Sequence, residues 1–293
     1  MAPSSAGPEA SLSERLSGVC TVLRAEVRAL RAAPAGRTPV IGLCGAQGSG
    51  KSTLARVLRS ALQQQDGLAV ALLSLDDLYL PSVERRRLAA TVHPLLRTRG
   101  VPGTHDIALG IELVHRLCGA APEAITRLPR FDKLADDPCA PELWEAFVGP
   151  ADVVLLEGWC VGARAQAPGA LSAAINELER QDDADGRWRR HVNQQLAGPY
   201  ASFFDLLDYL VLLRAPGFHV VQAWRREQEH ELAGRALPGP HAAPMSDSQL
   251  ERFIQHYERL TRHILEEMPA RADLVIELDE QRHITAVRRS GDG

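Results

Sequence analysis

Residues 45–52 read Gly-Ala-Gln-Gly-Ser-Gly-Lys-Ser, between an apolar segment and a segment with helical spacing. Glycine allows backbone torsions, and a close approach of other atoms, that a Cβ would forbid. The pattern G-x-x-x-x-G-K-S therefore predicts a loop whose successive N–H groups point at phosphate oxygens, at the positive end of a helix dipole. This motif restricts the fold strongly, because such a loop needs a strand before it and a helix after it.

The motif also predicts a nucleotide and a metal ion as cofactors. The residues expected to hold the phosphates of ATP are Gly45, Ala46, Gln47, Gly48, Ser49, Gly50, Lys51, Ser52 and Thr53. Lys51 is expected to bridge the β- and γ-phosphates, and Ser52 to bind Mg²⁺. A second metal carboxylate is expected from Glu157, which follows the apolar run 153–156 where Asp is usual. Asp152 begins that run, at the wrong end to reach the phosphates.

Five short apolar runs predict strands, at residues 39–44, 68–75, 153–156, 209–213 and 274–278. They are continuous rather than alternating, which suits strands buried on both faces of a parallel sheet. The segments between them are long enough for crossover helices. The best helical patterns lie at about 51–65, 107–118, 188–196, 218–232 and 246–268, the last with Ser246-Asp-Ser-Gln249 as its cap. The sequence thus predicts an α/β fold.

The chain is expected to form one domain over residues 37–293, preceded over residues 1–36 by a disordered start and a leading helix. Ser11-Leu-Ser-Glu14 has the capping-box pattern, and apolar residues follow it at helical spacing. Residues 233–244 are rich in Gly, Pro and Ala, which indicates a mobile loop.

Composition and charge exclude several classes of protein. The formal net charge of −4 gives no support for binding nucleic acid or an anionic membrane. No apolar run approaches the roughly 20 residues of a membrane span, and the first residues lack the features of a signal peptide. The five cysteines are widely spaced without a C-x-x-C pair, which argues against disulfides and a zinc site. A soluble cytoplasmic protein is expected, and nothing in the sequence indicates its oligomeric state.

Two kinds of nucleotide-binding protein do not fit. A GTPase needs an N/T-K-x-D motif for guanine, and neither Lys51 nor Lys133 stands in one. A nucleic-acid motor is not indicated, because the chain has no basic stripe with interleaved aromatic residues. Phosphoryl transfer to a small molecule is the chemistry left.

Asp76 and Asp77 follow directly after the second predicted strand. Because the carboxyl ends of parallel strands gather at the ligand crevice, both carboxylates are expected to face the phosphate-binding loop. A carboxylate there could orient or deprotonate an attacking hydroxyl, or hold a Mg²⁺ water. At least one of the pair is expected to cap a helix.

Several motifs resemble those of one kinase superfamily. Ser-Leu-Asp-Asp-Leu-Tyr at 74–79 and Glu-Gly at 157–158 look like the uridine kinase, phosphoribulokinase and pantothenate kinase superfamily. Segments similar to the D-glycerate 3-kinase family and its bacterial P-loop kinase relatives lie at 99–106, 128–133, 157–159, 176–179 and 224–229. The resemblance runs from about residue 38 to 290. It implies a P-loop NTPase fold, with a five-stranded parallel sheet between helices and a helical lid, and ATP-dependent phosphorylation of glycerate.

The resemblance also implies roles for single residues. Asp76 falls at the position of the candidate base, and Tyr79 completes its motif. The residues that fall in acceptor-binding segments, which would hold an anionic hydroxy acid, are His105, Asp106, Arg130, Asp132 and Lys133. Arg225 or Arg226, on the predicted lid helix, would close on the γ-phosphate. The alternative for these two arginines is a solvated Arg/Glu helix face.

The acceptor itself is left open. The segment after Lys133, LADDPCAP, lacks the glycine- and arginine-rich stretch associated with plant and fungal glycerate kinases. The same chemistry on a nucleoside, pantothenate or another sugar acid is therefore an alternative. A regulatory protein that binds ATP without any acceptor is another, although such a switch does not require the acceptor-type motifs at 99–106 and 129–133.

Lysine is almost absent from this chain. Of the 33 Lys and Arg residues, only Lys51 and Lys133 are lysine, and the abundance of Ala and Arg suggests a GC-rich genome as the main cause. Lys51 has a chemical reason to persist, because a compact ammonium fits between phosphates better than a planar guanidinium. Lys133 is a candidate for the same constraint, in the segment that the resemblance assigns to the acceptor.

Overall fold

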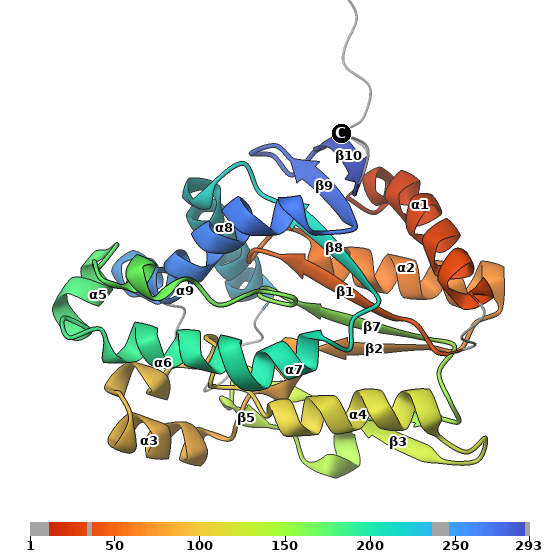
Figure 1. Cartoon of the computed structure of the whole chain (residues 1–293), viewed down its shortest axis with the longest axis horizontal. Coiled ribbons are helices and arrows are strands. Elements are labelled where there is room, and N and C mark those ends of the chain that lie inside the picture. The colour runs from red at the N-terminus through yellow and green to blue at the C-terminus, as the bar shows by residue number, and fades with distance from the viewer. Residues whose placement is uncertain (1–11, 34–36, 236–245, 291–293) are drawn as a thin grey trace, which may run out of the picture.

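A six-stranded sheet forms the centre of the computed structural model (Figure 1). The structure describes residues 12–33, 37–235 and 246–290. The strand order is β10-β9-β8-β1-β7-β2, with bounds β1 Val40–Gly45, β2 Val70–Ser74, β7 Val153–Gly158, β8 Tyr209–Arg214, β9 Leu274–Leu278 and β10 Ile284–Arg289. Five strands are parallel, as predicted, and β10 joins β9 in the antiparallel direction. The apolar-run criterion missed β10 because this half-exposed edge strand has no continuous apolar run.

Helices cover both faces of the sheet (Figure 1). Their bounds are α1 Leu12–Ala32, α2 Lys51–Asp66, α3 Ser82–Thr91, α4 Ile107–Gly119, α5 Glu177–Asp182, α6 Arg187–Gln195, α7 Ala201–Phe204, α8 Phe218–Arg235 and α9 Asp247–Glu267. The predicted leading helix is confirmed, although its capping box at 11–14 begins outside the described residues. The capping box of α9 is present, with Ser246 and Gln249 bonding each other's backbone N–H groups. The mobile loop was predicted to begin at residue 233, but α8 continues to Arg235. Residues 236–245 lie outside the described part.

Two hydrophobic cores lie on opposite faces of the sheet. In β1, Ile41 and Leu43 pack in one core with side chains of α1, α2 and α8. The alternate residues Val40 and Cys44 pack in the other core with side chains of α4, α7 and α9. All four side chains are at most 2% exposed. The continuous apolar runs therefore mark strands buried on both faces, as the sequence predicted.

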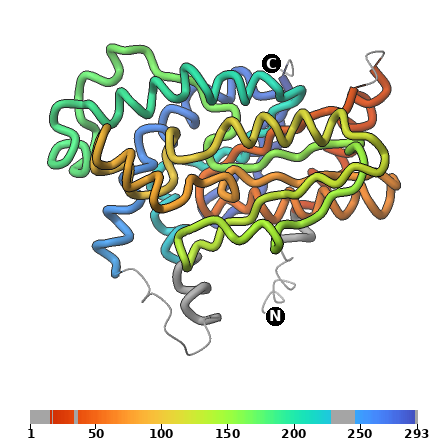
Figure 2. The backbone as a smooth tube through the Cα atoms, turned by 90° about the horizontal axis from the view of Figure 1, so that it is seen from below, coloured from red at the N-terminus to blue at the C-terminus, as the bar shows by residue number. Residues whose placement is uncertain are grey.

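Two short antiparallel ribbons lie outside the main sheet. In one, β3 Ile125–Leu128 pairs with β6 Glu145–Val148; in the other, β4 Phe131–Asp132 pairs with β5 Asp137–Pro138. Seen from below, α4 and the β3–β6 ribbon run along the same side of the molecule (Figure 2). These ribbons bring residues 130–133 to the end of β2, beside Asp76 and Asp77. In the described part of the chain, no helix is long and apolar enough to cross a membrane.

A buried ion pair fixes α9 to the segment that contains α5. Arg259 donates to both carboxylate oxygens of Glu179, at 2.7 and 2.6 Å, and to the carbonyl oxygens of Ala170 and Ala173. The Glu179 side chain is 0% exposed. Removing one partner of such a pair leaves an uncompensated charge in the interior.

We therefore predict that Arg259→Ala lowers the free energy of unfolding by about 3–5 kcal/mol in urea denaturation. Arg262→Ala is the matched control on the same helix, because Arg262 pairs with Glu258 at an exposed i,i+4 position and should cost no more than about 1 kcal/mol. The double variant Arg259→Met/Glu179→Gln should regain part of the loss, since it buries no charge. Equal effects of Arg259→Ala and Arg262→Ala would contradict the anchoring role.

Candidate active site

The loop between β1 and α2 has the backbone that the glycine pattern predicted. Gly48 and Gly50 have φ angles of 78° and 89°, in the left-handed region that favours glycine. Gly50 is the N-cap of α2, and no side chain of the described residues caps that end of the helix. The first turn of α2, all of which is described, contains no acidic residue. Its N–H groups and positive dipole end are therefore suited to an anion.

The carboxyl ends of three parallel strands bring a metal-binding set of oxygens together. Glu157 pairs in register with Ser74 of β2 and Leu43 of β1. Its Oε1 accepts hydrogen bonds from Ser74 at 2.8 Å and from Ser52 at 3.1 Å. Its Oε2 is buried and has no hydrogen-bond partner among the described residues. An unpaired carboxylate oxygen beside a serine hydroxyl is what Mg²⁺ prefers as a ligand set, so the residues fit this ion.

Asp152 lies at the opposite end of β7, as expected. It accepts from the backbone N–H of Ala69 at 2.8 Å and pairs with Arg31 of α1. It therefore ties the strand to its neighbours at the far edge of the sheet.

Asp76 is held as a carboxylate by cations and hydrogen bonds. Its two oxygens accept from Tyr79 Oη at 2.9 Å and from Lys133 Nζ at 2.6 Å. Burial raises the pKa of Asp76, but the charges of Lys133 and Lys51, with the hydrogen bonds from Lys133 and Tyr79, hold that pKa well below its ordinary value. Asp76 is 30% exposed, so it is both ionised and open to a ligand.

Asp77 has a different environment. It accepts from the backbone N–H of Phe131 at 3.0 Å and lies 3.5 Å from Arg130, and its pKa is raised chiefly by burial. The expectation that one of the pair would cap a helix is wrong. The short helical turn Leu75–Leu78 begins after Ser74 without a side-chain cap, and both carboxylates bind groups elsewhere.

The two lysines of the chain therefore act on the same carboxylate. The Lys133 ammonium contacts Asp76 directly, and the Lys51 ammonium lowers the pKa of Asp76 through its charge. Arg99, whose guanidinium lies over the ring of Phe131, pairs with Asp136 and donates to the carbonyl oxygen of Lys133. The cationic segment predicted to flank an acceptor thus lies at the end of β2.

His105 is buried, and its ring packs against two tyrosines. It is 5% exposed and stacks on Tyr79, with ring centroids 4.5 Å apart. Burial lowers its pKa to about 3, against the opposing charge of Asp76, so the ring is neutral. Tyr200 Oη accepts from the N–H of Gly103 at 3.0 Å and forms a hydrogen bond of 2.6 Å with His105 Nδ1. The other ring nitrogen, Nε2, has no partner in the described part of the chain.

The other predicted acceptor residues differ in their roles. Arg130 is half exposed and lies near Asp77 and Glu145, with which it lines a shallow cavity. Asp106 is the N-cap of α4 and accepts from the N–H of Leu109. Asp132 accepts from two N–H groups of its own turn. The structure thus gives Asp106 and Asp132 local structural roles, and any contact of theirs with an acceptor stays a prediction.

The predicted lid arginines both contact α9 or the residue at its start. Arg226 lies 3.4 Å from Asp247, and the guanidinium of Arg225 lies 5.7 Å from the ring of Phe253. Their action on a phosphate stays a prediction. Sequence reasoning gave no role to Ser74 or Tyr200. The hydroxyl that ends an otherwise apolar strand was a usable signal for Ser74, whereas Tyr200, 95 positions from His105, offered none.

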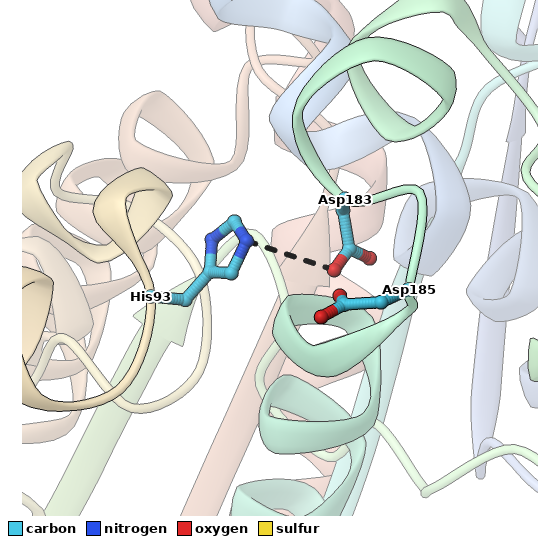
Figure 3. A group of neighbouring side chains, drawn as sticks. All are labelled: His93, Asp183 and Asp185. Atoms are coloured by element: carbon cyan, nitrogen blue, oxygen red, sulfur yellow. Dashed lines mark ion pairs between the residues drawn. The ribbon is translucent and has the colours of Figure 1, made fainter.

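Within the described residues, His93, Asp183 and Asp185 form a group with metal-ligand spacing (Figure 3). His93 Nδ1 accepts from the N–H of Leu95, so Nε2 carries the proton and faces Asp183 at 3.8 Å. Asp183 already accepts from the N–H of Trp188 and from the guanidinium of Arg189. A protonated nitrogen and a paired carboxylate are poor metal ligands, so this group holds the start of α6 in place.

Comparison with known proteins gives relatives along most of the chain. The chain is 33% identical over 232 residues to the uncharacterized kinase mug58 of Schizosaccharomyces pombe, covering 76% of this chain and 80% of that protein. It is 28% identical over 259 residues to the chloroplastic D-glycerate 3-kinase of Arabidopsis thaliana, covering 83% of this chain and 53% of that longer protein. No protein-family model matches.

A solved structure confirms the fold. The D-glycerate 3-kinase from Cryptococcus neoformans superposes with a TM-score of 0.73 at 24% identity, over 96% of this chain and 99% of that one. At this identity the likeness concerns the arrangement of strands and helices and not the substrate.

The burial of His105 predicts a specific loss of stability in acid. Because the pKa is about 3 in the folded state and near 6.5 in the unfolded chain, the unfolded state binds the proton first, and stability falls as pH drops below about 6.5. From pH 7 to pH 5 the wild type should lose about 2 kcal/mol more than His105→Gln, which cannot titrate. Urea denaturation of both proteins at several pH values checks this, and parallel curves would contradict a buried neutral ring.

Proposed function

This chain belongs to the P-loop kinase family of its fission-yeast relative, and on that premise we propose that it transfers the γ-phosphoryl group of ATP to D-glycerate, forming 3-phosphoglycerate. The likeness to two D-glycerate 3-kinases supports the choice of acceptor. The observation that carries it is Asp76, an ionised carboxylate at the ligand edge of the sheet that binds the ammonium of Lys133 and is stabilised by the charge of Lys51.

The nucleotide half of the proposal uses the loop of residues 45–53. Its N–H groups and the N-terminus of α2 bind the phosphates, and Lys51 bridges the β- and γ-phosphates. Ser52 and Glu157 would hold Mg²⁺, directly or through water. When bound, this ion neutralises charge on the phosphate oxygens.

The acceptor half uses Asp76 to orient the attacking hydroxyl. A carboxylate with a lowered pKa is a weak base but a good hydrogen-bond acceptor, which suits a transfer that depends on positioning and charge stabilisation. Lys133 and Arg130 supply positive charge for the carboxylate of glycerate, and His105 offers its unpartnered Nε2 to the acceptor. Arg225 or Arg226 would have to leave α9 to reach the γ-phosphate.

An ADP-release assay with purified protein tests the proposal. With MgATP and D-glycerate we expect turnover of about 1–100 per second, and none with Lys51→Ala. L-glycerate, pantothenate and uridine serve as competing acceptors. Release that responds to one of these and not to D-glycerate would contradict the acceptor. Slow release that no acceptor increases would instead indicate a regulatory ATP-binding protein.

Lys133→Arg tests whether the ammonium of Lys133 is needed. Arginine keeps the charge, but its planar guanidinium cannot replace a point charge 2.6 Å from Asp76 without displacing the acceptor. We expect kcat to fall by about tenfold or more, with an unchanged melting temperature and unchanged KM for ATP. Arg116→Lys, in an exposed pair on α4, is the matched control for exchange of the two cations. Wild-type kinetics of Lys133→Arg would make Lys133 an ordinary surface lysine.

A further inference from the structure

The turn between β9 and β10 has an unusual residue at its last position. The N–H of Arg282 donates to the carbonyl oxygen of Asp279 at 3.0 Å, and the N–H of Asp279 to that of His283 at 2.9 Å. Arg282 itself has a φ angle of 65°. A hairpin with this turn ordinarily has glycine at the left-handed position. Among the described non-glycine residues, only Asp136 shares such a φ, and aspartate accepts it far more readily than arginine does.

The side chain of Arg282 reaches the phosphate-binding loop. Its Nε donates to the carbonyl oxygen of Gly48 at 2.7 Å. Its guanidinium lies 5.2 Å from the ring centre of Trp224 and donates to Glu227 at 2.6 Å, both on α8. A surface pair with Glu227, which is 58% exposed, contributes little to stability. The contact that distinguishes Arg282 is therefore the one with the loop backbone.

Gly48 is also the place where α8 meets the loop. A Cβ on Gly48 would lie 2.6 Å from Cβ of Trp224, closer than real Cβ contacts allow. Trp224 is 1% exposed, and its Nε1 donates to the carbonyl oxygen of Glu280 at 2.7 Å. The turn and α8 thus contact each other, and both contact the loop at Gly48.

We propose that Arg282 is a positioning residue of the nucleotide site. A carbonyl oxygen that turned toward the phosphates would repel them, and Arg282 holds the Gly48 carbonyl in a hydrogen bond. The loop is then organised for phosphate before the nucleotide arrives, which lowers the cost of binding. Local backbone strain that a distant contact compensates is typical of functional positions. The inference rests on the nucleotide half of the proposed function and is independent of the acceptor.

Arg282→Gly separates this role from a structural one. Glycine suits the left-handed position, so the melting temperature should stay the same or rise. The Kd of MgADP, measured by calorimetry, should rise about tenfold, and the KM for the acceptor should not change. Arg288→Ala is the matched control, because Arg288 lies on the same hairpin and pairs with Glu277; it should alter neither quantity.

Three outcomes would overturn the inference. In the first, Arg282→Gly binds MgADP as tightly as the wild type. In the second, Arg288→Ala weakens binding as much as Arg282→Gly does. In the third, Arg282→Gly loses affinity together with a lowered melting temperature, so that a loss of stability accounts for the weaker binding. If the glycine variant does not fold, Arg282→Asn is measured in the same way, because asparagine tolerates a positive φ. A wild type that binds no MgADP would instead refute the nucleotide half of the proposed function.

Discussion

The parallel alignment of β1, β2 and β7 determines where chemistry can occur in this molecule. Because these strands end at the same edge, the phosphate-binding loop, Ser74 and Glu157 come together although they are far apart in the sequence. Helix dipole, serine hydroxyls and an unpaired carboxylate oxygen then face a common space. The charged residues of the candidate acceptor side lie at the end of β2, at that same edge: Asp76, Asp77, Arg130 and Lys133.

Much of this arrangement could be predicted because its signals are local. A continuous apolar run predicts a doubly buried strand, and the glycine pattern predicts a backbone, so the five parallel strands and the loop at 45–52 follow from short stretches of sequence. Lys133 could be singled out because lysine is so rare in this chain. The ion pair between Lys133 and Asp76 gives a physical reason for a lysine at this position.

What could not be predicted depends on contacts between distant segments. The hydrogen bond between His105 and Tyr200 joins residues 95 positions apart. Arg282 lies in a turn that resembles any polar hairpin, and only the folded chain brings it to Gly48. Such roles have no periodicity, spacing or motif that a single sequence could show.

The pKa values of Asp76 and His105 are both lowered, which has a consequence for the response of the site to pH. The pKa of Asp76 is held well below its ordinary value, and that of His105 is lowered to about 3, so one is charged and the other neutral throughout the range of cellular pH. These two groups keep a constant charge when a cell acidifies. Any dependence of turnover on cellular pH would then have to come from groups other than these two.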